Sequence, residues 1–242
     1  MLIDLDSELP VTLTYYAHCS FLWHTPKGIR VIIDPYRNDE GWYWFTRKFP
    51  SVECDLVLIT HAHFDHDAAN CLPDSASVLR IPGEFHYKDI FIRGILDKHS
   101  GTLSKGIPNV MFIIETAGIR FLHIGDNYIQ WSKDIKRAVE NIDVLMVTVD
   151  DACRLLTYSE VHTLIKIVKP RVVIPMHYRI PELMPDTITL KPINKWLSTQ
   201  PVVRSIGNHS IKLSRKDLPG SLEVWVFEPS PEVFTAPHSH FP

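Results

Sequence analysis

Residues 60–66 read Thr-His-Ala-His-Phe-Asp-His and place three imidazoles and one carboxylate within six positions. Imidazole nitrogens and carboxylate oxygens are the atoms that bind zinc, iron and manganese in proteins. His61 and His63 are two apart and can point the same way in an extended segment, whereas Asp65 and His66 can face a second position. The spacing therefore suggests two cations. The alternative is a polar loop whose histidines cap a helix and contact solvent.

The elements around this segment would place it at the edge of a sheet. The apolar run 56–59 (Leu-Val-Leu-Ile) directly precedes it and predicts a short buried strand. Open α/β sheets carry their functional sites at the carboxyl ends of such strands. Four further polar residues also follow predicted strands: Asp34, His99, Asp126 and His177.

Three of these four have an alternative interpretation. His86 lies in the same stretch as His99, but an apolar strand leads to His99 and a Ser-Gly pair follows it, which favours His99. Asp126 could cap a helix that begins near Ser132. His177 could be a buried core histidine, although it follows a Val-Val-Ile strand and precedes a break.

The His-x-His-x-Asp-His pattern resembles that of the metallo-β-lactamase superfamily, and the order Asp, HxHxDH, His, Asp, His over roughly residues 11–180 matches the family order. The phrases at 99–100, 123–126 and 174–178 resemble the subgroup of ascorbate-6-phosphate lactonase and related small metal-dependent hydrolases. The resemblance implies that Asp34 holds the metal loop through hydrogen bonds. It also implies a first cation on His61, His63 and His99, a second on Asp65, His66 and His177, and Asp126 as a bridge between them.

This ligand set implies a binuclear hydrolase that uses a metal-bridging hydroxide on a small ester, lactone or phosphodiester. Histidine-rich ligation favours two Zn²⁺ ions, with manganese or iron as alternatives. His63 stands where the dioxygen-reducing diiron members carry glutamate, which counts against oxygen chemistry. Asp65 could orient the hydroxide, and Tyr178 could donate to a developing oxyanion or simply pack beside the strand end.

Two other histidines match positions in the family without being expected ligands. His18 could line the pocket, and His123 is expected to pack in the interior or beside the ligands. The sequence contains no Gly-x-Ser-x-Gly motif, so it does not suggest a serine hydrolase.

Two other functional classes remain open. A phosphodiesterase or nuclease would need a basic track for the nucleic-acid backbone. The basic pairs at 47–48 and 215–216 are short and far apart, and the net charge is −3, so nucleic acid is not an expected partner. A non-catalytic metal-containing binding or sensor protein would be expected to lack a ligand, and none is missing. The expected partner is therefore a small-molecule substrate.

The fold class expected from the resemblance is α/β (α+β), a four-layer αβ/βα sandwich of two mixed β-sheets with helices outside. Periodicity alone supports only a mixture of strands and helices, with helices at 66–72, 132–140, 157–169 and 191–198. A chain of 242 residues with 45% hydrophobic residues can bury a large core. We expect one domain over residues 1–228 and a proline-rich C-terminal tail over 229–242.

The sequence predicts a cytoplasmic protein. It shows no apolar stretch long enough to span a membrane and no signal-peptide pattern. The four cysteines form no CxxC pair, which is typical of a reducing compartment; Cys153 could approach the site, but a buried, inert thiol is the simpler interpretation.

Two segments depart from the subgroup. Residues 36–50 form an aromatic-rich insertion with four consecutive aromatic residues at 42–45, which could pack over the core, form a lid or join subunits of a homo-oligomer. Asp150 and Asp151 replace a glycine-rich turn. They would disfavour an anionic substrate, or they could cap the next element.

Overall fold

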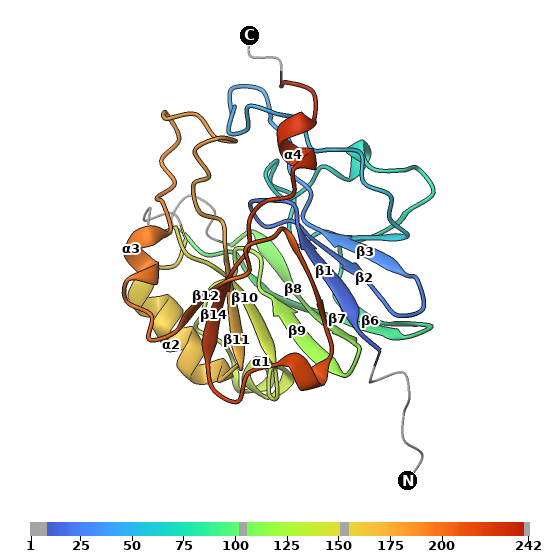
Figure 1. The fold of residues 1–242 in the computed structure, drawn as a ribbon, viewed down its shortest axis with the longest axis vertical. Coiled ribbons are helices and arrows are strands. Elements are labelled where there is room, and N and C mark those ends of the chain that lie inside the picture. The colour runs from blue at the N-terminus through green and yellow to red at the C-terminus, as the bar shows by residue number, and fades with distance from the viewer. Residues whose placement is uncertain (1–8, 102–105, 151–154, 240–242) are drawn as a thin grey trace.

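The computed structural model describes residues 9–101, 106–150 and 155–239, and two β-sheets dominate it (Figure 1). The six-stranded sheet has the order β13 (Ser210–Leu213), β1 (Val11–Tyr15), β2 (Phe21–His24), β3 (Arg30–Ile33), β4 (Leu56–Leu58) and β5 (Ser77–Leu79). The eight-stranded sheet has the order β12 (Val203–Ser205), β14 (Glu223–Val226), β11 (Val172–Met176), β10 (Val144–Thr148), β9 (Ile119–His123), β8 (Pro108–Thr116), β7 (Ile90–Lys98) and β6 (Gly83–Tyr87). Each sheet contains parallel and antiparallel pairs.

The core lies between the two sheets. Side chains of β1 alternate between buried and partly exposed, as expected for a strand with one covered face. β10 and β11 are buried along their whole length, and their sequences are accordingly continuous apolar runs. Trp23 of β2 contacts Phe121 of β9 edge-on, with ring centroids 5.7 Å apart, so the sheets interlock through large aromatic side chains.

Two of the predicted helices form close to where the sequence places them. α1 (Lys133–Ala138) begins after Ser132, whose hydroxyl accepts a hydrogen bond from the Ile135 amide. α2 (Tyr158–Val168) begins with the predicted capping box of Thr157 and Glu160 and packs on β10 through its buried face. α3 (Asn194–Leu197) is shorter than the predicted helix at 191–198. Figure 1 shows α2 and α3 on the side of β11, β12 and β14.

The structure corrects two expectations. The helix predicted at 66–72 is only a 3₁₀ turn, η2 (Ala69–Cys71), and Pro73 follows two positions after its end. Among the described residues, fewer helical residues therefore cover the six-stranded sheet than the predicted four-layer sandwich would have. The polar neighbours of His86 predict a solvated loop, but residues 83–87 form β6, which makes a hairpin with β7. Every residue of β6 is exposed, so its sequence lacks the alternation that marks a half-buried strand.

The strand directions explain why distant polar residues meet. β9, β10 and β11 are parallel, and β7 runs the same way because both β7 and β9 pair antiparallel with β8. In the other sheet β3 and β4 are parallel, and β1 runs with them because both β1 and β3 pair antiparallel with β2. The carboxyl ends of these strands therefore share one edge within each sheet.

The C-terminal segment docks onto the aromatic insertion. It contains α4 (Glu232–Thr235), in which Val233 is fully buried. The amide of Lys48 donates to the carbonyl of Pro237, and the amide of Ser239 donates to that of Thr46. Over the described residues, no helix has the length and hydropathy that a bilayer crossing requires.

Candidate metal centre

Four side chains from three strand ends form the first donor set: His61, His63, His99 and Asp126. His61 Nε2 lies 3.0 Å from His63 Nδ1, and His99 Nε2 lies 3.3 Å from Asp126 Oδ2. Ligands of a tetrahedral zinc ion with bonds of 2.0–2.1 Å are about 3.3 Å apart. The spacing of this set therefore suits one cation.

The second donor set contains Asp65, His66 and His177, joined by His18. The Oδ2 atom of Asp65 lies 3.2 Å from His18 Nε2, 3.4 Å from His177 Nε2 and 3.7 Å from His66 Nε2. All four side chains are buried. The three nitrogens around one oxygen again have the spacing of ligands around a cation.

Asp126 lies between the two sets. Its Oδ1 atom is 3.3 Å from His66 Nε2 in the second set, and its Oδ2 atom is 3.3 Å from His99 Nε2 in the first. Nevertheless Asp126 Oδ1 and the Nε2 atoms of His66, His99 and His177 are buried without a hydrogen-bond partner among the described residues. Buried polar atoms that are close but unpaired are costly, and here they converge, as ligand lone pairs do around a cation.

Hydrogen bonds on the far sides of the rings fix their orientation. Asp34 Oδ2 lies 2.8 Å from His66 Nδ1, and the same carboxylate accepts hydrogen bonds from the amide and hydroxyl of Thr60 at 2.9 and 2.7 Å. Asp34 therefore ties the start of the 60–66 segment to a ring at its end, as the resemblance implies. The Thr60 hydroxyl lies 3.0 Å from His61 Nδ1, and the carbonyl of Ser100 accepts from the imidazole of His99.

Asp150 orients the imidazole of His177 in the same way. Its Oδ2 atom lies 3.1 Å from His177 Nδ1, and the carboxylate is fully buried. Sequence reasoning considered Asp150 only as a substrate-facing charge or a helix cap, although its position after a buried strand at this edge was a signal. Asp151 and Cys153 lie outside the described residues.

Several backbones at this edge adopt the left-handed conformation. Asp34, His18 and His177 have φ values of 45°, 53° and 60°. Such strain persists where the surrounding structure enforces it, commonly at functional sites. Gly125 has φ of 56°, and a Cβ atom there would lie 2.7 Å from the Thr60 side chain, so only glycine lets the Asp126 turn approach the 60–66 segment.

Burial and the neighbouring side chains shift the pKa values of the carboxylates and imidazoles in the centre. Burial alone would raise the pKa of Asp65 and Asp126, but their histidine neighbours, His66 foremost, hold both pKa values well below the usual range. Burial lowers the pKa of His61 and of His63 and lowers that of His18 to about 4. The two carboxylates are therefore anionic and three of the imidazoles neutral, which are the forms that bind metals.

Without a bound metal, the pKa values of His66 and His177 are shifted in the opposite direction from those of His18, His61 and His63. Burial is the largest single effect and would lower their pKa values, but the neighbouring carboxylates, Asp126 foremost, together outweigh it in both. The pKa of His66 is raised well above its ordinary value, and that of His177 is raised to about 10. These two rings carry the protons that a cation would have to displace.

The remaining candidates lie elsewhere. His123 is buried, and its Nε2 atom lies 2.9 Å from the Cys19 carbonyl, which is the packing position expected for it. His86 is on the exposed strand β6, away from both sets. Tyr178 is buried, and burial raises its pKa to about 12 while its hydroxyl interacts with that of Tyr15. Its role as an oxyanion donor stays a prediction.

The aromatic insertion borders the second donor set. Phe45 and Phe49 are buried, whereas Trp42 keeps 49% of its surface exposed. Trp44 is half-buried, and its ring lies edge-on to those of His177 and His18, at 6.1 and 6.2 Å between centroids. The segment therefore packs partly over the core and partly beside the site; its use as a subunit contact stays a prediction.

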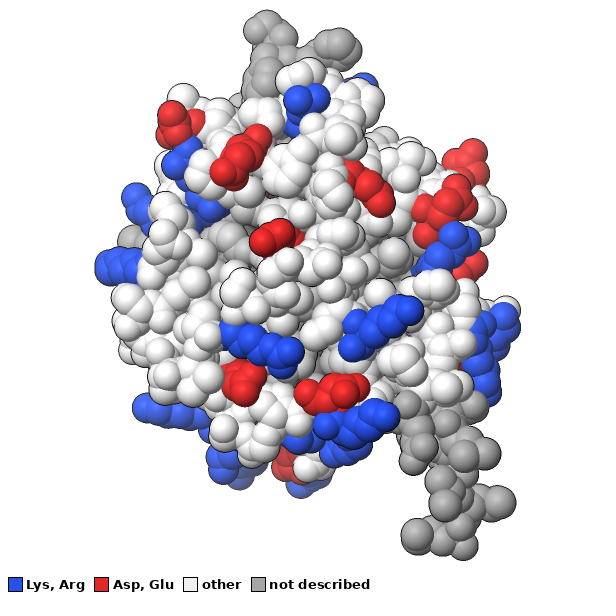
Figure 2. Space-filling model, viewed as in Figure 1, with Lys and Arg blue, Asp and Glu red and all other residues white. Residues whose placement is uncertain are grey.

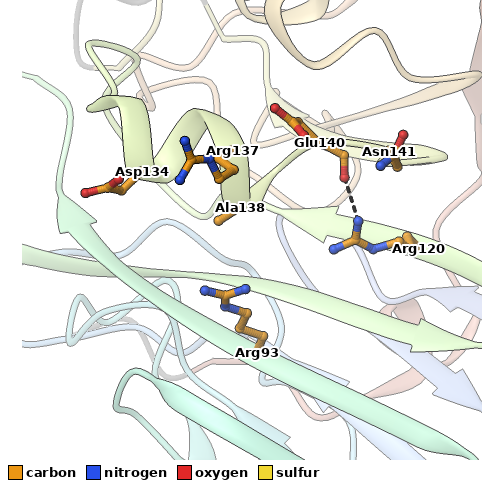
Figure 3. A pocket seen from close by; sticks show the side chains of 7 residues that line it. All are labelled: Arg93, Arg120, Asp134, Arg137, Ala138, Glu140 and Asn141. Carbon is orange, nitrogen blue, oxygen red and sulfur yellow. Dashed lines mark hydrogen bonds between the residues drawn. The ribbon is translucent and has the colours of Figure 1, made fainter.

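A separate surface pocket lies between β7, β9 and α1 and is lined by arginines and acidic side chains (Figure 3). Arg120 there donates to the Glu140 carbonyl and to the Glu115 carboxylate, so its charge is already partnered. None of the residues that line this pocket belongs to either donor set.

The fold and the donor sets define a metal-dependent hydrolase of the metallo-β-lactamase sandwich class. The family model described as "Beta-lactamase superfamily domain" matches residues 12–177, and the chain belongs to this family. A UPF0173 protein of Pyrococcus abyssi is 26% identical over 190 residues, covering 69% of this chain and 82% of that protein. A UPF0173 metal-dependent hydrolase of Thermococcus kodakarensis is also 26% identical, covering 69% and 84%.

A solved structure gives the same fold. A metallo-β-lactamase superfamily protein of Thermotoga maritima superposes with a TM-score of 0.67 at 22% identity, covering 90% of this chain and 100% of that one. The predicted fold class is thereby confirmed. The predicted enzyme class is confirmed by the family model and by relatives named metal-dependent hydrolases. The narrower resemblance to ascorbate-6-phosphate lactonase is not supported by these comparisons.

Proposed function

We propose that this protein is a binuclear hydrolase that acts on a small ester, lactone or phosphodiester. The observation that carries the proposal is the position of Asp126 between the two donor sets. Its Oδ2 atom lies 3.3 Å from His99 of the first set, and its Oδ1 and Oδ2 atoms lie 3.3 and 3.6 Å from His66 and His177 of the second. A single-cation protein would have no use for the second set. The metal-ligand roles proposed for His61, His63, Asp65, His66, His99, Asp126 and His177 follow from this arrangement.

Bound divalent cations would lower the pKa of a water molecule toward ~7 and polarise the substrate's carbonyl or phosphoryl oxygen. The chain's own residues hold the geometry. Asp34, Asp150 and the Ser100 carbonyl orient the rings of His66, His177 and His99 through their Nδ1 atoms. Asp65, anionic and buried among three imidazoles, is placed to orient the attacking water.

Zinc is the metal that we propose for both sets. Six histidine nitrogens and only two carboxylates make up the two sets, His18 included, and this donor chemistry suits zinc better than the oxygen-preferring cations. Manganese and iron also accept such ligands, so the metal that gives activity has to be measured rather than assumed.

The substrate class is open within the ester, lactone and phosphodiester group. Asp150 is fully buried and contacts His177 Nδ1, so its carboxylate does not face an incoming substrate directly. A sugar-phosphate lactone, the substrate class that the subgroup resemblance suggests, therefore belongs among the compounds to be tried.

A nuclease is the weaker alternative. On the face shown in Figure 2, lysine and arginine side chains are interspersed with aspartate and glutamate and form no continuous basic track. The net charge of −3 agrees with this. A non-catalytic metal-binding protein is the second alternative, and it is disfavoured by two complete donor sets that adjoin half-exposed side chains of His63 and Trp44.

The proposal is tested by metal analysis combined with a substrate panel. Protein stripped by a chelator is titrated with Zn²⁺, and its metal content is measured after each equivalent by plasma mass spectrometry. Hydrolysis of p-nitrophenyl esters, aliphatic lactones and bis(p-nitrophenyl) phosphate is followed in parallel. We expect two equivalents to bind and hydrolysis to require both. Hydrolysis that survives complete removal of metal, or binding of a single equivalent, would contradict the proposal.

A further inference from the structure

We propose that His18 is a ligand of the second cation. This inference rests on the binuclear function proposed above, but the ligand set implied by the family resemblance does not include His18. The structure places a His18 nitrogen in the same group as ligand atoms of Asp65, His66 and His177, all within 4.8 Å of one another. The ring centroid lies 4.2 Å from that of His177 and 5.4 Å from that of His66.

The turn that carries His18 is held firmly. The amide of His177 donates to the His18 carbonyl at 3.1 Å, and the Tyr15 hydroxyl donates to the same oxygen at 3.2 Å. Across the turn, the Tyr16 amide donates to the carbonyl of Ser20. The backbone of His18 and that of Ala17 are both left-handed, a conformation that costs free energy and that these contacts maintain.

The ring itself has little room to turn away from the donor set. His18 is fully buried, with Phe45 edge-on at 5.4 Å and Trp44 edge-on at 6.2 Å. The aromatic insertion therefore packs against the His18 ring, which also contacts His177 and His66. Its Nε2 atom stays directed at Asp65, 3.2 Å from the carboxylate oxygen.

A purely structural role would leave this histidine poorly satisfied. Its Nδ1 atom is buried without a hydrogen-bond partner among the described residues, so the contact between Nε2 and Asp65 is the one hydrogen bond of the imidazole ring there. An apolar side chain would fill the same space without that cost. If a cation lies among His18, Asp65 and His177, the His18 nitrogen can instead bind it.

This assignment makes the two cation sites unequal. The second site would have donors that are all buried, whereas the first includes the half-exposed ring of His63. Closed donor sets are typical of tightly held zinc, and open sets leave a position for water or substrate. Substrate would accordingly approach from the side of the first site.

The test is titration of metal-free protein with Zn²⁺ and Co²⁺ in the variants His18→Asn and His18→Gln. Asparagine tolerates the left-handed backbone and removes the imidazole, whereas glutamine can still donate a hydrogen bond to Asp65. The readouts are calorimetric affinity for each equivalent and the visible absorption of the second Co²⁺ ion. His24→Asn, on the exposed end of β2, is the matched control.

We expect both His18 variants to bind the first equivalent as the unmodified protein does. Affinity for the second should fall about a hundredfold or more, because loss of even an outer-shell partner costs about 10–100-fold. The second Co²⁺ ion should show altered absorption, and His24→Asn should match the unmodified protein. Unchanged second-equivalent affinity in both variants, or restoration by glutamine alone, would overturn the proposal. Binding of only one equivalent by the unmodified protein would instead refute the binuclear function itself.

Discussion

The Oδ2 atom of Asp34 lies 2.8 Å from Nδ1 of His66 at the centre of the site, and both side chains are fully buried. The contact orients the imidazole so that Nε2 faces Asp65 and Asp126. The same carboxylate holds Thr60, which begins the motif segment. Asp34 is not itself among the proposed metal ligands. Its hydrogen bonds nevertheless fix the 60–66 segment, which would bind both cations.

Replacement of Asp34 by asparagine should therefore weaken metal binding without unfolding the protein. Asparagine fits the left-handed backbone at this position, where φ is 45°, but removes the negative charge that fixes the His66 tautomer. We expect zinc affinity to fall about 10–100-fold, as is usual for outer-shell partners. Calorimetric titration measures this, and Asp55→Asn, an exposed carboxylate that accepts from the Arg30 amide, is the control. Equal affinity in the two variants would show that Asp34 does not orient the loop.

The ligand assignment is tested by His61→Ala and Asp126→Ala. Each removes a donor whose partners lie within 4 Å, and Asp126 serves both sets, so metal content and hydrolysis should be lost together. We expect His61→Ala to lose the first equivalent of zinc and Asp126→Ala to weaken both. His86→Ala, on the exposed strand β6, should retain both equivalents. Unchanged zinc content in both ligand variants would rule out this assignment.

How far the sequence could predict the site depends on what positions each residue. His61, His63, Asp65 and His66 lie in one segment after an apolar strand, so local pattern alone identifies them. His99, Asp126 and His177 also follow strands, but only the family order indicates that three distant strand ends converge. They converge because their strands run in the same direction within the sheets. Strand direction is a property of the whole topology, so no short stretch of sequence reveals it.

Other features have no local signal. His18 reaches the second donor set through a turn between β1 and β2 with two left-handed residues, and nothing in its neighbours predicts that conformation. The helix predicted at 66–72 is interrupted at Ala68, whose amide donates to the carbonyl of the distant Pro35 rather than to a preceding turn. Strand β6 has no buried face, so hydrophobic periodicity could not reveal it.

Gly125→Ala should destabilise the protein and displace Asp126. A methyl group there meets the Thr60 side chain and the Asn109 amide oxygen at 2.7 Å, on a backbone with φ of 56°. We expect a loss of about 1–3 kcal/mol in the free energy of unfolding, the range for a strained backbone. Gly220→Ala is the control, because a Cβ there meets nothing within 4 Å. Chemical denaturation of both variants gives the comparison, and equal stabilities would contradict the close approach.

The variant Tyr178→Phe tests whether the Tyr178 hydroxyl has a catalytic or a structural role. The Tyr178 hydroxyl interacts with that of Tyr15, which in turn donates to the His18 carbonyl, so this pair supports the turn beneath the site. We expect stability to fall by about 1 kcal/mol, the usual worth of one hydrogen bond, with kcat changed by less than about threefold. Thermal unfolding and steady-state kinetics measure the two effects. A fall in kcat of about a hundredfold at unchanged stability would instead establish the phenol as an oxyanion donor.

The protonation of His66 and His177 predicts that pH affects the stability of the metal-free protein more than that of the zinc-loaded protein. The folded chain raises the pKa of His177 to about 10 and that of His66 well above normal, whereas both titrate near ~6.5 when unfolded. The stabilisation from these protons is complete below the unfolded value and is lost as pH rises toward the folded one.

Between about pH 7.5 and 8.5 the metal-free protein should therefore become less stable as pH rises, by up to about 1.4 kcal/mol per pH unit for each ring. The buried thiols of Cys19 and Cys54, whose pKa values are raised by burial, act in the same direction and only toward the top of this range. Zinc must displace the two imidazole protons, so its affinity should increase over the same interval while the stability of the zinc-loaded protein stays nearly level. Denaturation and calorimetry in buffers of different ionisation enthalpy measure both effects. Metal-free protein whose stability rises with pH in this interval would show that these rings are neutral before zinc binds.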